Sequence, residues 1–315
     1  MQEQNRDLQQ EQNRDRVLTR LATPLIILAT VIWGSSFVVM KSSVDVLPTF
    51  WLLAIRFTAS AIVLALVFWK RWKLADKQYF IGGGIMGFFL FLAYSFQTFG
   101  LEGTTPGKNA FLTAVYCVIV PFLYWAVARQ RPDRYNIAAA VLCIAGIGLV
   151  SVTGDNAAAV SMGDGLTLVG GFFFAAHIVA VSRFSQGRDI FLLTAIQFAS
   201  FALFSWLGVL ATRPALPVEA MDGGLALSLA YLVIFASCGA LLFQNIGQKY
   251  TAPATAAVLL SLEAPFGVLF SVLFADERPT PLMALGFVLI FVAVICSETK
   301  FSFLRRERRE AVRAE

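Results

Sequence analysis

The stretch FQTFGLEGTTPGKNAFL, at residues 96–112, returns as FQNIGQKYTAPATAAVL at residues 243–259, a constant offset of 147 residues. The matching residues include Gln97 with Gln244, Gly100 with Gly247, Pro106 with Pro253, Ala110 with Ala257 and Leu112 with Leu259. The match continues without a gap to Arg131–Pro132 and Arg278–Pro279. Collinear matches of this kind predict that the chain is a duplication.

The composition predicts what kind of unit is duplicated. The chain has 315 residues, of which 58% are hydrophobic and 14% are charged, and its mean hydropathy is +0.71. Soluble domains are about 45–50% apolar and about 25% charged, so we expect an all-α polytopic membrane protein. Ten apolar runs are long enough to cross a hydrocarbon core of about 30 Å as helices. They cover residues 24–41, 49–69, 79–100, 108–128, 135–152, 163–182, 190–211, 224–246, 253–275 and 281–298.

The distribution of lysine and arginine along the chain predicts its orientation in the membrane. They gather in alternate connections and at the two ends of the chain, for example at Lys70–Lys77, Arg129–Arg134 and Arg305–Arg313. Cytoplasmic loops carry such an excess, so we expect both termini to be cytoplasmic. In order along the chain we expect a disordered cytoplasmic tail at 1–23, a five-helix repeat at 24–152, a second five-helix repeat at 163–298, and a basic cytoplasmic tail at 299–315.

Five helices per repeat is an odd number, so the second copy must enter the membrane from the opposite side. Inverted repeats of this kind are found in secondary transporters, which hold the substrate near the membrane midplane between the repeats. Rocking of one half against the other then gives alternating access. The duplication therefore favours a transporter over a channel. An enzyme is disfavoured because the sequence has no paired catalytic set, and a sensor because we find no soluble domain to relay a signal.

The sequence lacks the residues that several common metal, catalytic and nucleotide-binding sites require. His177 is the only histidine, and the four cysteines lie inside apolar runs. A histidine-based zinc site and a histidine-dependent triad are therefore excluded, and no nucleotide-binding loop is present. We expect no enzymatic activity, no cofactor, no metal and no nucleic-acid partner. The expected partners are a small-molecule substrate and the lipid bilayer.

Four stretches resemble the EamA family of the drug/metabolite transporter superfamily. They are WGSSFVVMK at 33–41, RF at 56–57, GKNAFLTAVYCVIVPFLYWAVARQRP at 107–132 and SLEAPFGVLFSVLFADERP at 261–279. The last departs from the family pattern because Ala264 separates Glu263 from Pro265. The resemblance implies ten helices in two inverted repeats and export of small metabolites across a bacterial inner membrane. Within the family the chain is most similar to amino-acid exporters, including those for aromatic amino acids. The alternative is export of cationic toxicants resembling methyl viologen, or of another metabolite such as a sugar or nucleotide derivative.

Polar side chains at membrane depth are the candidate substrate site, because they are costly there and usually face the bundle interior. The candidates are Trp33, Tyr94, Gln97, Asn109, Tyr116, His177, Gln244 and Glu263. Each has a structural alternative. The amides can join helices, Asn109 can cap one, the aromatic residues can pack in the core, and His177 can be a satisfied interior histidine.

Glu263 is a candidate for more than one role. It can bind a substrate amine, carry a proton that couples export to the gradient, or serve as a structural acid capped by hydroxyls and amides. For Arg56 we expect a structural or gating role. Pro121 and Pro265 remove backbone donors near the middles of their helices. We therefore expect these prolines to act as hinges by which each half opens and closes.

Overall fold

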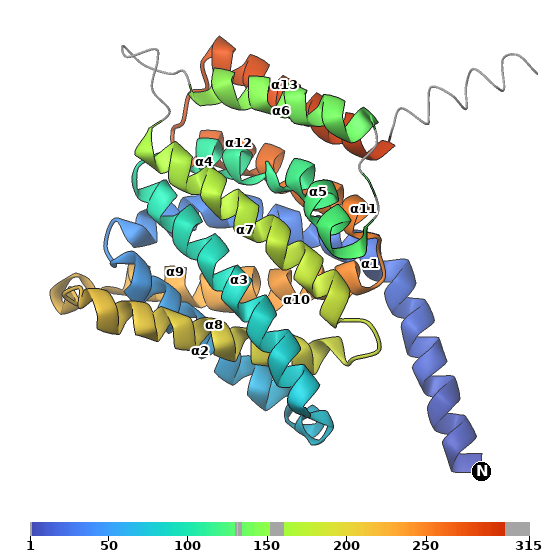
Figure 1. Ribbon diagram of the computed structural model, residues 1–315. Coiled ribbons are helices and arrows are strands. Elements are labelled where there is room, and N and C mark those ends of the chain that lie inside the picture. Colours follow the sequence, from blue (N-terminus) through green and yellow to red (C-terminus); the bar gives the residue numbers. More distant parts are fainter. Residues whose placement is uncertain (1, 130, 132–133, 152–160, 300–315) are drawn as a thin grey trace, which may run out of the picture.

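The computed structural model describes residues 2–129, 131, 134–151 and 161–299, and these are helices joined by short connections, without a strand (Figure 1). The first half of the chain holds α1 Gln2–Val44, α2 Thr49–Val67, the 3₁₀ segment η1 Trp69–Leu74, α3 Lys77–Glu102, α4 Pro106–Thr113, α5 Tyr116–Ala128 and α6 Arg134–Ser151. The second half holds α7 Met162–Phe184, α8 Ile190–Thr212, η2 Val218–Ala220, α9 Gly223–Tyr231, η3 Leu232–Gly239, α10 Ala240–Lys249, α11 Pro253–Ser261, α12 Glu263–Phe274 and α13 Pro281–Thr299. The predicted all-helical class is confirmed for these residues.

Among the described residues, eight helical segments are long and apolar enough to cross a membrane. Two of the ten predicted runs fall on α6 and α13, whose apolar stretches are shorter, at Ile137–Gly146 and Pro281–Ala293. Large apolar side chains lie on the outside of the bundle; Ile144 is 70% exposed and Leu227 is 73% exposed. Such a surface suits contact with lipid rather than water.

Helices of the first half pack against helices of the second. The main pairs are α3 with α7, α1 with α10, α2 with α8, α6 with α13, and α4 with α12. In Figure 1, α6 and α13 lie side by side along one edge of the bundle. The core is therefore an interface between the two halves, and any cavity in it is lined by both.

The N-terminal segment differs from the prediction. We expected residues 1–23 to be disordered, but α1 begins at Gln2 and runs without interruption to Val44. Glutamine, glutamate and arginine are good helix formers, and neither glycine nor proline occurs before Pro24. Local propensity therefore supports a helix even where there is little apolar surface to bury. Figure 1 shows this part of α1 projecting from the bundle. The predicted basic tail, apart from Thr299, lies outside the described residues.

Two spans are broken at matching positions. The α4–α5 span is interrupted at Ala114–Val115 and the α11–α12 span at Leu262. Pro265 explains the second break, because it has no N–H to donate to the Ser261 carbonyl one turn earlier. Pro121 lies inside α5 rather than at the break. Each broken span begins with a proline in its first turn, where the missing donor does no harm.

A third irregularity lies in the span formed by α9, η3 and α10. Its middle part, Leu232–Gly239, is a π-helix. Segments of this kind are rare and often occur at functional sites. The matching span of the first half, α3, is an uninterrupted α-helix.

Candidate functional site

A cavity lies between the two halves, at the level of both helix breaks. It is lined by residues of α1, α2, α3, α5, α7, α10, α11 and α12. The lining residues are Trp33, Ser36, Phe37, Met40, Arg56, Tyr94, Gln97, Thr98, Leu101, Tyr116, Phe174, Ile178, Gln244, Leu260 and Glu263. Seven of them are residues that the sequence analysis selected: Trp33, Arg56, Tyr94, Gln97, Tyr116, Gln244 and Glu263.

Arg56, on α2, supplies a buried positive charge to the cavity. Its side chain is only 1% exposed. Nε donates a hydrogen bond to Ser237 Oγ at 2.7 Å, and Nη1 contacts the sulfur of Met40 at 3.2 Å. The guanidinium carbon lies 5.1 Å from the centre of the Tyr94 ring. Nη2 makes no hydrogen bond within the described part of the chain, so it remains able to donate to an anion.

Glu263 brings a buried carboxyl group to the same cavity. It is 5% exposed and stands at the first position of α12. The positive end of a helix dipole stabilises an anion placed there. Its carboxylate lies beside the Tyr116 side chain. Oε1 has no hydrogen-bond partner among the described residues.

These two groups are not neutralised by an ion pair. The ion pairs found in the described residues join Lys41 to Asp45, Arg71 to Asp189 and Lys108 to Asp164. An uncompensated charge in the interior is strongly destabilising, and ionisable groups at membrane depth usually mark a substrate or ion path. The cavity therefore presents a buried guanidinium and a buried carboxyl group, each with an atom unpartnered among the described residues that a ligand can bond.

Aromatic side chains form the apolar part of the cavity wall. The Trp33 indole N–H is held by the Ala236 carbonyl at 2.9 Å. Tyr94 and Phe174 pack edge to face, with ring centres 5.3 Å apart, and Phe174 is also near Tyr116. Rings fixed in this way give the cavity wall an apolar, aromatic face.

The two glutamines that match across the repeat both reach the cavity. Gln97 Nε2 donates to Thr113 Oγ1 at 2.9 Å. Thr113 is the last residue of α4, directly before the break. This contact links the cavity wall to the broken span.

Asn109 and His177 do not line the cavity. Asn109 Nδ2 donates to the Gln97 carbonyl at 3.1 Å and to Thr167 Oγ1 at 2.7 Å, which joins α3, α4 and α7. His177 Nε2 lies 3.1 Å from Gln197 Nε2, and Gln197 Oε1 accepts from Asn245 at 3.0 Å. Both residues are fully buried. Asn109 thus joins helices, and the cap of α4 is Thr105 rather than Asn109; His177 has a partner at Nε2 but none at Nδ1 among the described residues.

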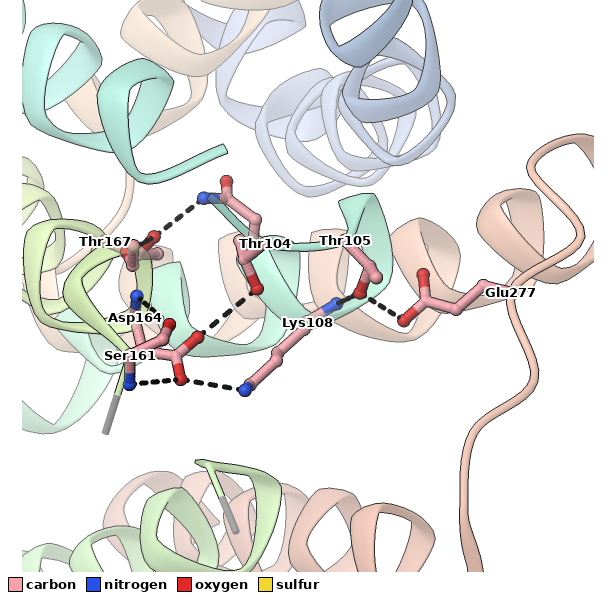
Figure 2. A network of polar contacts seen from close by, with 9 residues as sticks. Thr104, Thr105, Lys108, Ser161, Asp164, Thr167 and Glu277 are labelled. Atoms are coloured by element: carbon pink, nitrogen blue, oxygen red, sulfur yellow. Dashed lines mark hydrogen bonds and ion pairs between the residues drawn. The ribbon is translucent and has the colours of Figure 1, made fainter. Parts of the chain in front are cut away.

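A separate polar network surrounds the N-terminus of α4 (Figure 2). Glu277, in the connection after α12, accepts from Thr105 Oγ1 at 2.5 Å and from Gly107 N at 2.9 Å. Lys108 Nζ pairs with Asp164 at 2.8 Å, and the Asp164 side chain is completely buried. The network ties α4 of the first half to two elements of the second. The charge bias predicts that this end faces outside.

Several lining residues were missed by the sequence analysis. A spacing signal could have found them, because residues at i, i+3, i+4 and i+7 share a helix face. On α1 the series is Trp33, Ser36, Phe37 and Met40, and on α3 it is Tyr94, Gln97, Thr98 and Leu101. The spacing of lining residues could not have found Ser237, because Ser237 does not line the cavity and instead bonds to Arg56, which does.

Helices of membrane-spanning length and a polar cavity between two similar halves define a polytopic membrane transporter. Comparison with known families agrees: the chain matches the EamA-like transporter family twice, over residues 20–152 and 161–299. It belongs to this family. The two matches confirm the resemblance, and they coincide closely with the two predicted repeats.

Two curated relatives, both from Archaeoglobus fulgidus, are described as uncharacterized transporters. One is 34% identical over 269 residues, covering 85% of this chain and 82% of the relative. The other is 27% identical over 282 residues, covering 88% and 96%. A crystal structure that is 18% identical aligns with a TM-score of 0.66, over 90% of this chain and 98% of that one. At this identity the last similarity establishes the fold alone.

Proposed function

We propose that this protein is a secondary transporter that exports amino acids, with preference for large apolar or aromatic side chains. The observation that carries the proposal is the presence of Arg56 and Glu263 in one cavity, each buried and each with an atom free to bond. A zwitterion carries one carboxylate and one ammonium group on the same carbon. An amino acid is therefore a small ligand that has a partner for each of these residues.

In this proposal Arg56 binds the substrate carboxylate through Nη2. Guanidinium–carboxylate bonds are among the stronger hydrogen bonds in proteins. Glu263 accepts from the ammonium group, and Trp33, Tyr94 and Phe174 surround the side chain. The amides of Gln97 and Gln244 supply further neutral hydrogen bonds. Removal of either charge on the ligand would leave a buried protein charge unmatched, so the site selects against such ligands.

The transport cycle in this proposal is alternating access between two inverted repeats. The cavity is built from both halves, so a movement of one against the other must open one side of it. The network at the N-terminus of α4 joins the halves at one end and has to separate when that end opens. We propose export across the inner membrane of a bacterium, with both termini cytoplasmic, on the basis of the lysine and arginine bias.

Glu263 has a second proposed role, as a proton carrier that couples export to the proton gradient. The two roles predict different behaviour in exchange. Exchange of substrate for substrate needs binding but no net proton movement, so it survives in Glu263→Gln if the residue only carries protons. It fails if the carboxylate holds the substrate ammonium group.

A cationic toxicant is the second candidate substrate. The aromatic wall and Glu263 suit an organic cation, since rings attract cations through their faces. Arg56 opposes this, because a dication would be placed beside a buried guanidinium. The same experiment distinguishes the two.

Counterflow in proteoliposomes tests the proposal. Vesicles are preloaded with one unlabelled compound at a time, and entry of labelled phenylalanine, threonine or alanine is followed. The panel also contains methyl viologen and a sugar. Accumulation of label driven by internal amino acids supports the proposal. No accumulation with any internal amino acid contradicts it.

A further inference from the structure

We propose that the π-helical segment Leu232–Gly239 positions the substrate site, with Ser237 as the residue that orients Arg56. This inference rests on the proposed function, since it assigns a role toward the carboxylate of the substrate. Ser237 does not line the cavity, so it acts through Arg56 rather than by touching the ligand.

Two consecutive residues of this segment hold two cavity side chains from two other helices. The Ala236 carbonyl accepts from Trp33 Nε1 on α1 at 2.9 Å, and Ser237 Oγ accepts from Arg56 Nε on α2 at 2.7 Å. Ala236 and Ser237 are both completely buried. A carbonyl inside an ordinary α-helix is occupied by the N–H four residues later. In a π-helix the partner is five residues later, and a carbonyl oxygen has a second lone pair with which Ala236 can also accept from the Trp33 indole.

The contact with Ser237 matters because Arg56 has few alternatives. Nη1 contacts the Met40 sulfur, which is a weak acceptor. The rings of Phe57 and Tyr94 border the guanidinium at 5.3 and 5.1 Å. The Ser237 hydroxyl fixes the Nε edge of the planar group. This contact therefore restricts the orientation of the whole group, including Nη2, which has no hydrogen-bond partner among the described residues.

The two halves differ at this point. At the offset of 147 residues, Ser237 matches Leu90, a buried apolar residue of the regular helix α3. Arg56 matches Gln197 at the offset that relates LAIRF to TAIQF. Gln197 bonds to His177 and Asn245 instead. The serine and the π-helix therefore occur in the span of the second half, which contacts Arg56. Neither occurs in α3, the matching span of the first half.

The test measures counterflow of phenylalanine and of phenylalaninamide, which lacks the carboxylate, with Ser237→Ala. We expect the KM for phenylalanine to rise roughly tenfold, because a hydrogen bond to a charged group is lost. The maximal rate and the KM for the amide should change little. Ser237→Thr keeps the hydroxyl and should restore the KM. Ser205→Ala is the matched control, because Ser205 is a buried serine of α8 that bonds its own helix at Phe201.

The outcomes separate this inference from the proposed function. Absence of amino-acid exchange in the wild-type protein rejects the proposed function and this inference with it. Normal exchange in the wild type, with an unchanged KM in Ser237→Ala, rejects the positioning role alone. An equal rise in KM for phenylalanine and its amide also rejects it. If Ser237→Ala does not fold, Ser237→Cys keeps a side chain of similar shape with a weaker hydrogen-bond acceptor. The KM for phenylalanine must then rise in Ser237→Cys while the KM for phenylalaninamide changes little.

Discussion

Tyr116 and Glu263 are matching residues of the two halves that meet at the same cavity. They are 147 positions apart, and each is the first residue after the break in its span. Their side chains lie next to each other. The duplication has thus brought two equivalent positions together and left them with different chemistry, one a phenol and one a carboxylate. This asymmetry suits a ligand whose two ends differ.

Removal of the Glu263 charge tests its role in binding. We expect Glu263→Gln to raise the KM for phenylalanine in counterflow at least roughly tenfold, since a charge-assisted bond to the ammonium group is lost. Tyr116→Phe keeps the ring beside Glu263 and should have a smaller effect. Unchanged exchange in Glu263→Gln, together with loss of proton-driven accumulation, would assign the residue to coupling instead.

Restoring a backbone donor at residue 265 tests the hinge. In Pro265→Ala, the new N–H can bond to the Ser261 carbonyl and straighten the span across Leu262. We expect a lower transport rate with little change in thermal stability, because the broken geometry is replaced by regular helix. Pro121→Ala is the matched variant in the first half. Pro121 lies away from the break at Ala114–Val115, so its effect should be smaller. Transport rates equal to that of the wild type in both variants would contradict a hinge role for these prolines.

The network at the N-terminus of α4 should control opening at that end. In Glu277→Gln, the helix loses an anion at its N-terminus, an interaction worth about 1 kcal/mol. The population with this end open should rise severalfold. It is measured as labelling of Leu101→Cys by a membrane-impermeant maleimide, in a background without native cysteines. Ser42→Ala is the control, since in the described residues Ser42 is exposed and bonds the Val39 carbonyl of its own helix. Equal labelling in the two variants would contradict this role.

Close packing between the halves depends on Gly267. A Cβ at this position would lie 2.4 Å from the Cβ of Ala110 on α4, which is far inside van der Waals contact. We expect Gly267→Val to lower the melting temperature of the detergent-solubilised protein by several degrees, consistent with an overpacking penalty of about 1–3 kcal/mol. Gly84→Val is the control, because nothing lies within 4 Å of a Cβ there. Equal melting temperatures would show that α4 and α12 can separate without loss.

The fold was largely predictable because lipid permits few solutions. Apolar runs of sufficient length become helices, and repeated motifs at a fixed offset indicate a duplication. The N-terminal segment was not predicted, because lack of apolar residues was read as disorder while its helix propensity was overlooked. The π-helix at Leu232–Gly239 also left no trace in the hydropathy pattern, since its residues are as apolar as those around them.

The site was predictable in part. Polar residues at membrane depth identified Glu263, Gln97 and Gln244 as cavity residues. The same rule could not separate these from Asn109 and His177, because the cost of burial is the same whether a partner is another helix or a ligand. Arg56 was expected to have a structural or gating role. Its place in the cavity depends on packing between α2, α3 and η3, which no local pattern encodes.

If one cavity binds both charges of an amino acid, a ligand that lacks either charge should bind less tightly. Labelled phenylalanine counterflow is measured against unlabelled phenylalanine, phenylalaninamide and 3-phenylpropionate, which share the ring and differ in charge. We expect phenylalanine to compete at least tenfold better than either analogue. Arg56→Gln should abolish its advantage over the amide, and Glu263→Gln should abolish its advantage over the acid. Equal competition by all three compounds would show that the cavity recognises the ring alone and would refute binding of both charges.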